Sequence, residues 1–180
     1  MKTHMLKRLR LLWKHRWTDP GLSHRWVDDA AADRLRARVQ ASERLHTGQI
    51  RVCVESALPS SYLWRLRGSE PVQSATRGRA MTWFGRLRVW DTERNNGVLI
   101  YLLLAEHAIE ILADRGLASA VPAGFWDHLA ARLVRQLQDG QTEQGLAEAI
   151  DEVGAQLVIH HPRSPADAPD NELPDALVRT

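Results

Sequence analysis

Residues 91–116, DTERNNGVLIYLLLAEHAIEILADRG, indicate the architecture of this chain more directly than any other segment. It contains two short apolar runs, residues 98–105 and 108–113, and only Glu106 and His107 separate them. Two such runs around a two-residue break are typical of a β-hairpin. Because Tyr101 is the one polar-tipped residue in the first run, we expect that strand to be buried on both faces, with helices covering both sides of its sheet.

Patterns on either side of the hairpin complete this architecture. The sequence predicts helices over residues 28–47, 72–87, 122–139 and 142–159, and a further strand over residues 50–55. The strand–helix–strand crossover makes the first two strands parallel, and the hairpin makes the third antiparallel to the second. We therefore predict an α/β fold, a three-layer α/β/α sandwich with a small mixed sheet of a parallel pair plus an antiparallel hairpin strand.

The composition indicates one ordinary globular domain. The chain has 180 residues, of which 44% are hydrophobic and 26% charged. We divide it into a basic arm (1–25), an α/β/α domain (26–162) and a flexible tail rich in proline and acids (163–180). The single cysteine, Cys53, excludes an internal disulfide and a cysteine-rich zinc site. The sequence shows the pattern of neither a signal peptide nor a membrane-spanning helix, so we expect a cytoplasmic protein.

The basic arm allows two interpretations. Residues 1–17 carry six basic side chains and no acid, and Leu6, Leu9, Trp13 and Trp17 recur among them at threes and fours. This is the pattern of an amphipathic helix, which could lie on an anionic membrane surface. It could instead fold back on the domain, with its tryptophans covering an apolar patch. We expect the second arrangement, because only one turn separates the arm from the domain.

A basic stretch later in the chain raises the question of nucleic acid. Its residues are Arg77, Arg79, Arg86 and Arg88, with Trp83 and Trp90 between and after them. Trp83, however, shares the apolar face of its predicted helix, which indicates a core residue, and the arginines of the other face would be solvated. We therefore do not expect nucleic acid as a partner.

Several blocks in their order and spacing resemble the TPM domain family. These blocks are GQIRV (48–52), Arg79-Ala80 with Phe84, NNGVLIYLLLAEHAIEILADRG (95–116) and Phe125-Trp126. The resemblance covers residues 26–162 and implies the same α/β/α fold. TPM proteins include members described as phosphatases and members described as binding calcium, so it also implies phosphatase activity or cation binding. The chain is most similar to the short soluble bacterial branch, since the secreted members carry a signal peptide and a C-terminal membrane helix.

Hard oxygen donors gather in the sequence around the predicted start of the second strand. They are Asp91, Asn95, Asn96 and Asp114, and the predicted topology also brings Glu43 and His46 to the same edge of the sheet. Calcium accepts carboxylate and amide oxygens, so this cluster is a candidate metal site. The alternative is turn chemistry, with Asn95-Asn96-Gly97 forming a turn and Asp114-Arg115 an ion pair. His46 would then end its helix as a cation that suits the helix dipole.

The opposite edge carries a second set of polar residues. They are Glu55, Ser56, Ser60 and Ser61, with Glu106 and His107 at the hairpin tip. Ligands of open α/β sheets bind at the carboxyl ends of the strands, which makes this edge a candidate site as well. The alternative is that hairpin tips and loops are simply polar.

These observations lead to one hypothesis and two alternatives. The hypothesis is a TPM-type binding module that uses a divalent cation, Ca²⁺ or Mg²⁺, and recognises a protein or a small molecule. The first alternative is a weak cation-dependent phosphatase. The loop of a cysteine phosphatase and other common phosphatase motifs are absent from the sequence, so any phosphatase activity would have to rest on a bound cation. The second is a membrane-surface adaptor that uses residues 1–17. The catalytic residues of any enzyme are not identified by the sequence.

Overall fold

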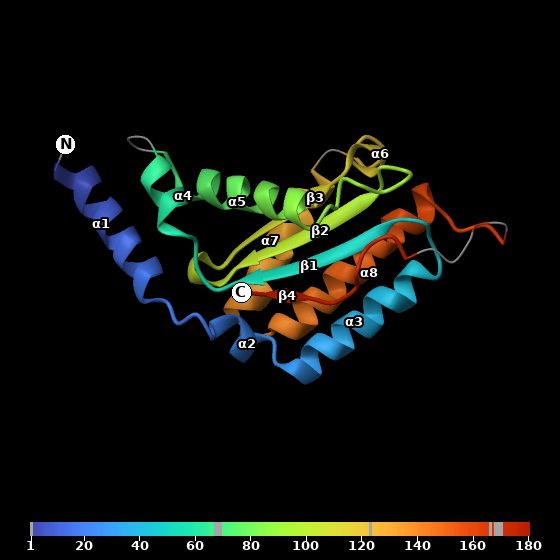
Figure 1. Ribbon diagram of the computed structural model, residues 1–180, viewed down its shortest axis with the longest axis horizontal. Helices are drawn as coiled ribbons and strands as arrows, with labels where there is room; N and C mark the ends of the chain where they lie inside the picture. The colour runs from blue at the N-terminus through green and yellow to red at the C-terminus, as the bar shows by residue number, and fades with distance from the viewer. Residues whose placement is uncertain (1, 67–69, 123, 166, 168–170) are drawn as a thin grey trace.

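The computed structural model describes residues 2–66, 70–122, 124–165, 167 and 171–180. Its centre is an open mixed sheet with the strand order β3-β2-β1-β4 (Figure 1). Strands β1 (Gln49–Glu55) and β2 (Gly97–Leu103) are parallel, and β3 (Ala108–Ala113) is antiparallel to β2. The predicted parallel pair and hairpin are therefore confirmed, as is the α/β/α class.

Helices cover both faces of the sheet (Figure 1). They are α1 (Lys2–Trp17), α2 (Leu22–Trp26), α3 (Asp29–Glu43), α4 (Ser60–Arg65), α5 (Val72–Arg86), α6 (Arg115–Ala118), α7 (Phe125–Gln138) and α8 (Thr142–His160). A 3-10 turn, η1 (Leu104–Glu106), joins β2 to β3, and His107 closes the turn in the left-handed conformation with φ 46°. Among the described residues, no helix is both long and apolar enough to cross a membrane.

The two faces of β2 supply two separate cores. Val98, Ile100 and Leu102 pack with α3, α7 and α8, whereas Leu99 and Leu103 pack on the side of α5. All seven residues of β2 are buried. Because both faces of this strand are covered, its side chains do not alternate between apolar and polar.

The C-terminal segment differs from the flexible tail that the sequence predicts. Val178–Arg179 forms β4, which pairs in parallel with β1 and extends the sheet. The Thr180 N–H donates to the carbonyl of Val54 at 3.0 Å, and Leu173 is buried. An unpaired edge of β1 would leave backbone groups without partners, and this pairing satisfies those beside Cys53 and Val54.

The arm folds back on the domain as expected, but its tryptophans do not make the contact. It is helical, but Trp13 and Trp17 remain 67% and 73% exposed, so they do not cover an apolar patch of the domain. The contacts come from the other face of α1, where Leu11 and Leu12 pack on the α5-side core. The spacing of the tryptophans correctly indicated a helix face, but a different face of the same helix meets the domain.

Gly97, the first residue of β2, provides a test of the packing at this end of the sheet. A methyl group at Gly97 would overlap the carbonyl oxygen of Val89, whereas one at Gly78 in α5 meets open space. We expect Gly97→Ala to lower the free energy of unfolding by about 2 kcal/mol, because the backbone must shift. Gly78→Ala is the control and should raise it by about 1 kcal/mol, since alanine favours helix. Urea denaturation measures both, and equal effects would contradict the close approach of Val89.

Candidate functional site

The start of β2 brings Asn95 and Asp114 into one neighbourhood. The backbone N–H of Asp114 donates to the Gly97 carbonyl at 2.8 Å, and that of Gly116 donates to the Asn95 carbonyl at 2.8 Å. Arg115 lies between the two side chains: its guanidinium donates to Asn95 Oδ1 at 3.0 Å, and its backbone N–H donates to Asp114 Oδ1 at 2.7 Å. The hairpin thus returns the end of β3 beside the start of β2, as the topology requires.

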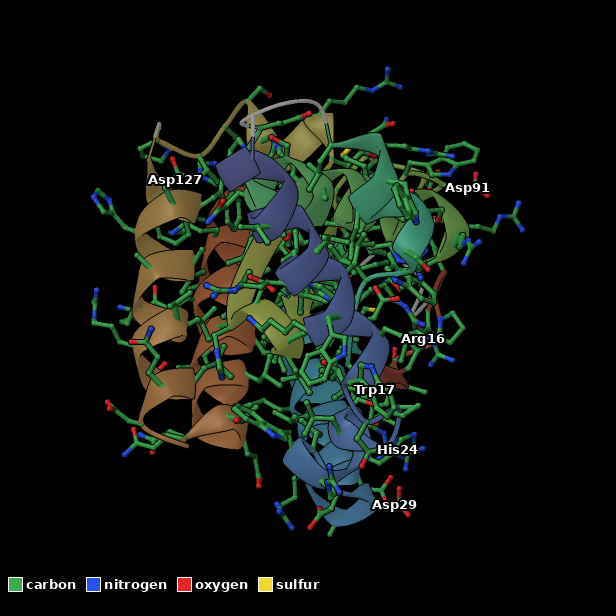
Figure 2. The ribbon with its side chains drawn as sticks, turned by 90° about the vertical axis from the view of Figure 1, so that its left-hand side faces the viewer. Arg16, Trp17, His24, Asp29, Asp91 and Asp127 are labelled. Atoms are coloured by element: carbon green, nitrogen blue, oxygen red, sulfur yellow. The ribbon has the colours of Figure 1, made fainter. Side chains whose placement is uncertain are left out.

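The other two members of the predicted oxygen cluster make separate contacts. Asn96 is fully buried, and its amide donates to Thr47 Oγ1 at 3.2 Å. Asp91 lies at the periphery of the molecule, where its carboxylate pairs with Arg88 at 2.8 Å (Figure 2). Hydrogen bonds from Arg115 therefore link Asn95 and Asp114, whereas Asn96 and Asp91 have other partners.

Two oxygens of this region are buried without a hydrogen-bond donor among the residues that the structure describes. They are Asp114 Oδ2 and Asn96 Oδ1. A buried acceptor that lacks a partner loses its hydration without compensation, and a cation is one means of restoring it. Two of the residues predicted as metal ligands therefore carry a buried oxygen that lacks a hydrogen-bond partner among the described residues.

Glu43 lies apart from these oxygens. It is 8% exposed, and its Oε1 accepts a hydrogen bond from the Ile50 N–H at 2.8 Å. Burial, helped by the neighbouring carboxylate of Asp175, raises the pKa of Glu43 to about 8, although the Ile50 bond opposes the shift. It lines a cavity of about 280 Å³ with residues that include Gln49 and Asp175. Glu43 is thus mostly neutral at pH 7, which suits a cation ligand poorly.

His46 is a neutral buried side chain rather than a cation at the end of α3. Its Nδ1 lies 3.1 Å from the Gly48 carbonyl, which can only accept, so Nδ1 carries the proton. Its Nε2 therefore accepts from the Ser42 hydroxyl at 2.9 Å. Burial lowers the pKa of His46 to about 4. The predicted interaction of a charged His46 with the helix dipole is therefore wrong at neutral pH.

The opposite edge of the sheet holds a cavity of about 330 Å³. Glu55, Ser56 and Ser60 line it, as the sequence predicted for a site at the carboxyl end of β1, and His15 and Arg16 of α1 line it too. The contribution of α1 was missed, because the sequence pattern drew attention to the tryptophans on the other face of that helix.

Hairpin-tip residues complete this edge without lining the cavity. Glu106 lies 3.0 Å from His15 Nε2 and 3.0 Å from Lys14 Nζ, and these contacts fasten α1 to the tip. Burial acts to raise the pKa of Glu106, but His15 and Lys14 outweigh it, so this pKa is lowered. The ring of His107 lies against Trp26, with centroids 5.8 Å apart.

Glu55 anchors a buried polar cluster that the sequence did not reveal. Its carboxylate accepts hydrogen bonds from Arg79, from Trp83 Nε1 at 3.0 Å and from Tyr101 Oη at 2.7 Å. The side chains of Glu55 and Arg79 are only 5% and 8% exposed. Burial, together with the adjacent Glu55 carboxylate, raises the pKa of Tyr101. Arg79, Trp83 and Tyr101 all donate to this one carboxylate, so the cluster joins β1, β2 and α5 structurally.

The chemistry open to these sites is limited. Cys53 is fully buried, and burial raises the pKa of its thiol, which is unfavourable for a nucleophile. In the part of the chain that the structure describes, no three His, Cys, Asp or Glu side chains lie together as metal ligands. A cation near Asp114 would therefore need amide or backbone oxygens as well.

Comparison with solved structures supports the fold. The NMR structure of the BA42 protein from the psychrophilic bacterium Bizionia argentinensis is 26% identical, with a TM-score of 0.67 over 84% of this chain and 94% of that chain. The N-terminal domain of a P. gingivalis protein, at 20% identity and a TM-score of 0.52 over 76% of this chain and 82% of that chain, shares the fold. No curated protein is significantly similar in sequence. The model of the TPM domain matches residues 25–156, and the chain therefore belongs to the TPM domain family.

Proposed function

We propose that this TPM domain is a binding module that takes up a divalent cation beside Asn95 and Asp114. The observation that carries the proposal is the buried Asp114 Oδ2, a carboxylate oxygen without a donor among the described residues. Membership in the TPM family establishes the domain. Cation binding, which the resemblance implies for some members, is proposed for this chain at these residues. Of the predicted donors, Asp114 is the primary ligand and Asn95 and Asn96 are secondary, whereas Asp91 and Glu43 have other roles.

The local chemistry favours Ca²⁺ over Mg²⁺. Calcium accepts irregular sets of six to eight oxygens, including backbone carbonyls, whereas magnesium requires a near-regular octahedron. The carbonyl oxygens of Arg94 and Asn95 both lie close to Gly116, since a β-carbon there would be 2.6 Å from each, so backbone oxygens are near Asp114. The Arg115 guanidinium occupies Asn95 Oδ1, and a bound cation would compete with it. This competition predicts weak affinity, in the range of about 10⁻⁴–10⁻³ M.

Calcium titration of the wild-type chain tests the proposal. Calcium at about ten times its Kd should add about 1.4 kcal/mol to the free energy of unfolding, and so raise Tm by about 3–5 °C. Asp114→Asn should abolish this rise, because it removes the charge while the side chain can still cap α6. Asp91→Asn is the matched control and should leave the rise intact, since Asp91 pairs with Arg88 at the surface.

Amide NMR shifts locate the binding and separate the outcomes. The largest shifts should fall on residues 95–97 and 114–116. If millimolar calcium moves neither Tm nor these amides, the cation proposal is wrong. The same samples should be assayed with p-nitrophenyl phosphate to test the phosphatase alternative. That alternative predicts hydrolysis that depends on calcium and is lost in Asp114→Asn.

A further inference from the structure

An exposed apolar stripe runs along α1. Leu6, Leu9, Trp13 and Trp17 are each more than half exposed, although their spacing places them on one face of the helix. The rings of Trp13 and Trp17 lie with their centroids 6.0 Å apart, which makes the stripe continuous at its C-terminal end. Figure 2 views the molecule from the side of α1, where the helix crosses the front of the domain.

The opposite face of α1 fixes the orientation of this stripe. His15 is 5% exposed, and its Nδ1 accepts a hydrogen bond from the Leu58 N–H at 3.0 Å. Lys14 contacts Glu106, and Leu11 and Leu12 pack on the core. Because this face already holds the helix to the domain, the tryptophan stripe is available to a partner outside the chain.

Charge identifies the kind of partner. Residues 1–17 contain six Lys and Arg and no acid, whereas residues 18–180 contain 18 basic and 22 acidic residues, a net charge of −4. Arg10 and Arg16 are exposed, and each lies one helical turn from Trp13, on either side of the stripe. An apolar stripe flanked by arginines complements a lipid bilayer with negatively charged headgroups. The bilayer offers acyl chains to the apolar residues and negative charge to the arginines.

We propose that α1 is a docking surface for an anionic lipid bilayer, on which the helix lies parallel to the membrane plane. The indole rings would sit at the headgroup level, with an apolar body facing the acyl chains and an N–H facing water. The arginines would contact anionic headgroups, where each basic residue strengthens binding about fivefold. This docking goes beyond the proposed cation binding, since it uses α1 and neither Asn95 nor Asp114.

A protein partner is the competing occupant. A second copy of this chain would bring two strongly basic helices together, and like charges at such an interface oppose association. An anionic bilayer meets the charge and the apolar stripe at once. The bilayer is therefore the expected partner of α1, and a protein interface at the stripe would overturn the proposal.

Co-sedimentation with vesicles tests this docking in the full chain. The wild-type chain should bind vesicles of phosphatidylcholine mixed with phosphatidylserine, should bind vesicles of phosphatidylcholine alone much more weakly, and should be released by high salt. Trp13→Ala with Trp17→Ala should weaken binding to the anionic vesicles at least about tenfold, because both rings leave the interface. Arg10→Glu with Arg16→Glu removes two attractive charges, each of which strengthens binding about fivefold, and adds two repulsive ones. This double variant should therefore bind the anionic vesicles more than about 25-fold more weakly than the wild-type chain.

The controls distinguish docking from a loss of fold. Trp90→Ala removes an exposed tryptophan that lies outside α1, and it should leave vesicle binding unchanged. The α1 variants should keep the wild-type Tm, since all four side chains are exposed. Three results would each overturn the proposal. The Trp13/Trp17 double variant could bind anionic vesicles as well as the wild-type chain does, or the wild-type chain could bind uncharged vesicles as well as anionic ones. The third result is a dimer of the wild-type chain in sedimentation equilibrium that the double variant does not form.

Discussion

We expect Arg79→Met to lower the free energy of unfolding by about 3–5 kcal/mol, because it leaves Glu55 as a buried carboxylate without its charged partner. Arg79 donates through both Nε and Nη2, and the two side chains are almost fully buried. Arg79 also lies over the rings of Tyr62 and Trp83, at 5.3 and 5.1 Å from their centroids. The substitution therefore removes an ion pair and two cation–π contacts while preserving much of the apolar stem.

Arg77→Met is the matched control, because Arg77 belongs to the same helix, is itself 64% exposed and pairs with the partly buried Glu110 at 3.0 Å. A pair with a solvent-exposed partner contributes about 0.2–1 kcal/mol. Urea denaturation of both variants gives the comparison. Adding Glu55→Gln to Arg79→Met should recover part of the loss, since the buried charge is then gone. If Arg79→Met is as mild as Arg77→Met, the buried pair does not stabilise the fold as described.

The second large effect concerns Glu43 and the dependence of stability on pH. The pKa of Glu43 is about 8 in the folded chain, against an ordinary value of 4.5. Between these values the folded state holds a proton that the unfolded state has lost, so the stability contributed by neutral Glu43 falls as pH rises from about 4.5 to about 8. Below that window there is no penalty, and above it the charged carboxylate is buried near Asp175.

Glu43→Gln should therefore raise the free energy of unfolding above pH 8 by about 3–5 kcal/mol and flatten its decline across the window. The glutamine can still accept from the Ile50 N–H, and it is neutral at every pH. Urea denaturation at a series of pH values measures this difference. Glu143→Gln is the control, because Glu143 is a surface partner of Arg34. A variant that follows the wild-type pH profile would contradict a raised pKa at Glu43.

Much of the fold could be predicted from sequence, because the period of the apolar residues reports local structure directly. The run from Val98 to Leu103 is apolar throughout, apart from the tip of Tyr101, and every position of β2 is buried. Val27, Ala31, Leu35 and Val39 recur at fours, and all four are buried. In both cases the pattern depends only on the geometry of a strand or a helix and on which face meets other layers.

The candidate sites could be predicted only in part. The topology correctly brings Asn95 and Asp114 to one end of the sheet, because a hairpin must return there. It does not fix side-chain direction: Asn95 adopts the left-handed conformation with φ 51°, and the next residue, Asn96, is hydrogen-bonded to Thr47 instead.

The hairpin, the parallel pair and the helical layers follow from periodicity and chain connectivity, so they can be predicted from the sequence. The folded structure is needed to see which face of α1 packs, that Val178–Arg179 adds a strand to β1, and that Glu55 pairs with Arg79. Each of these three features depends on a partner distant in sequence. A local pattern specifies which surfaces must be buried, and the folded chain selects what buries them.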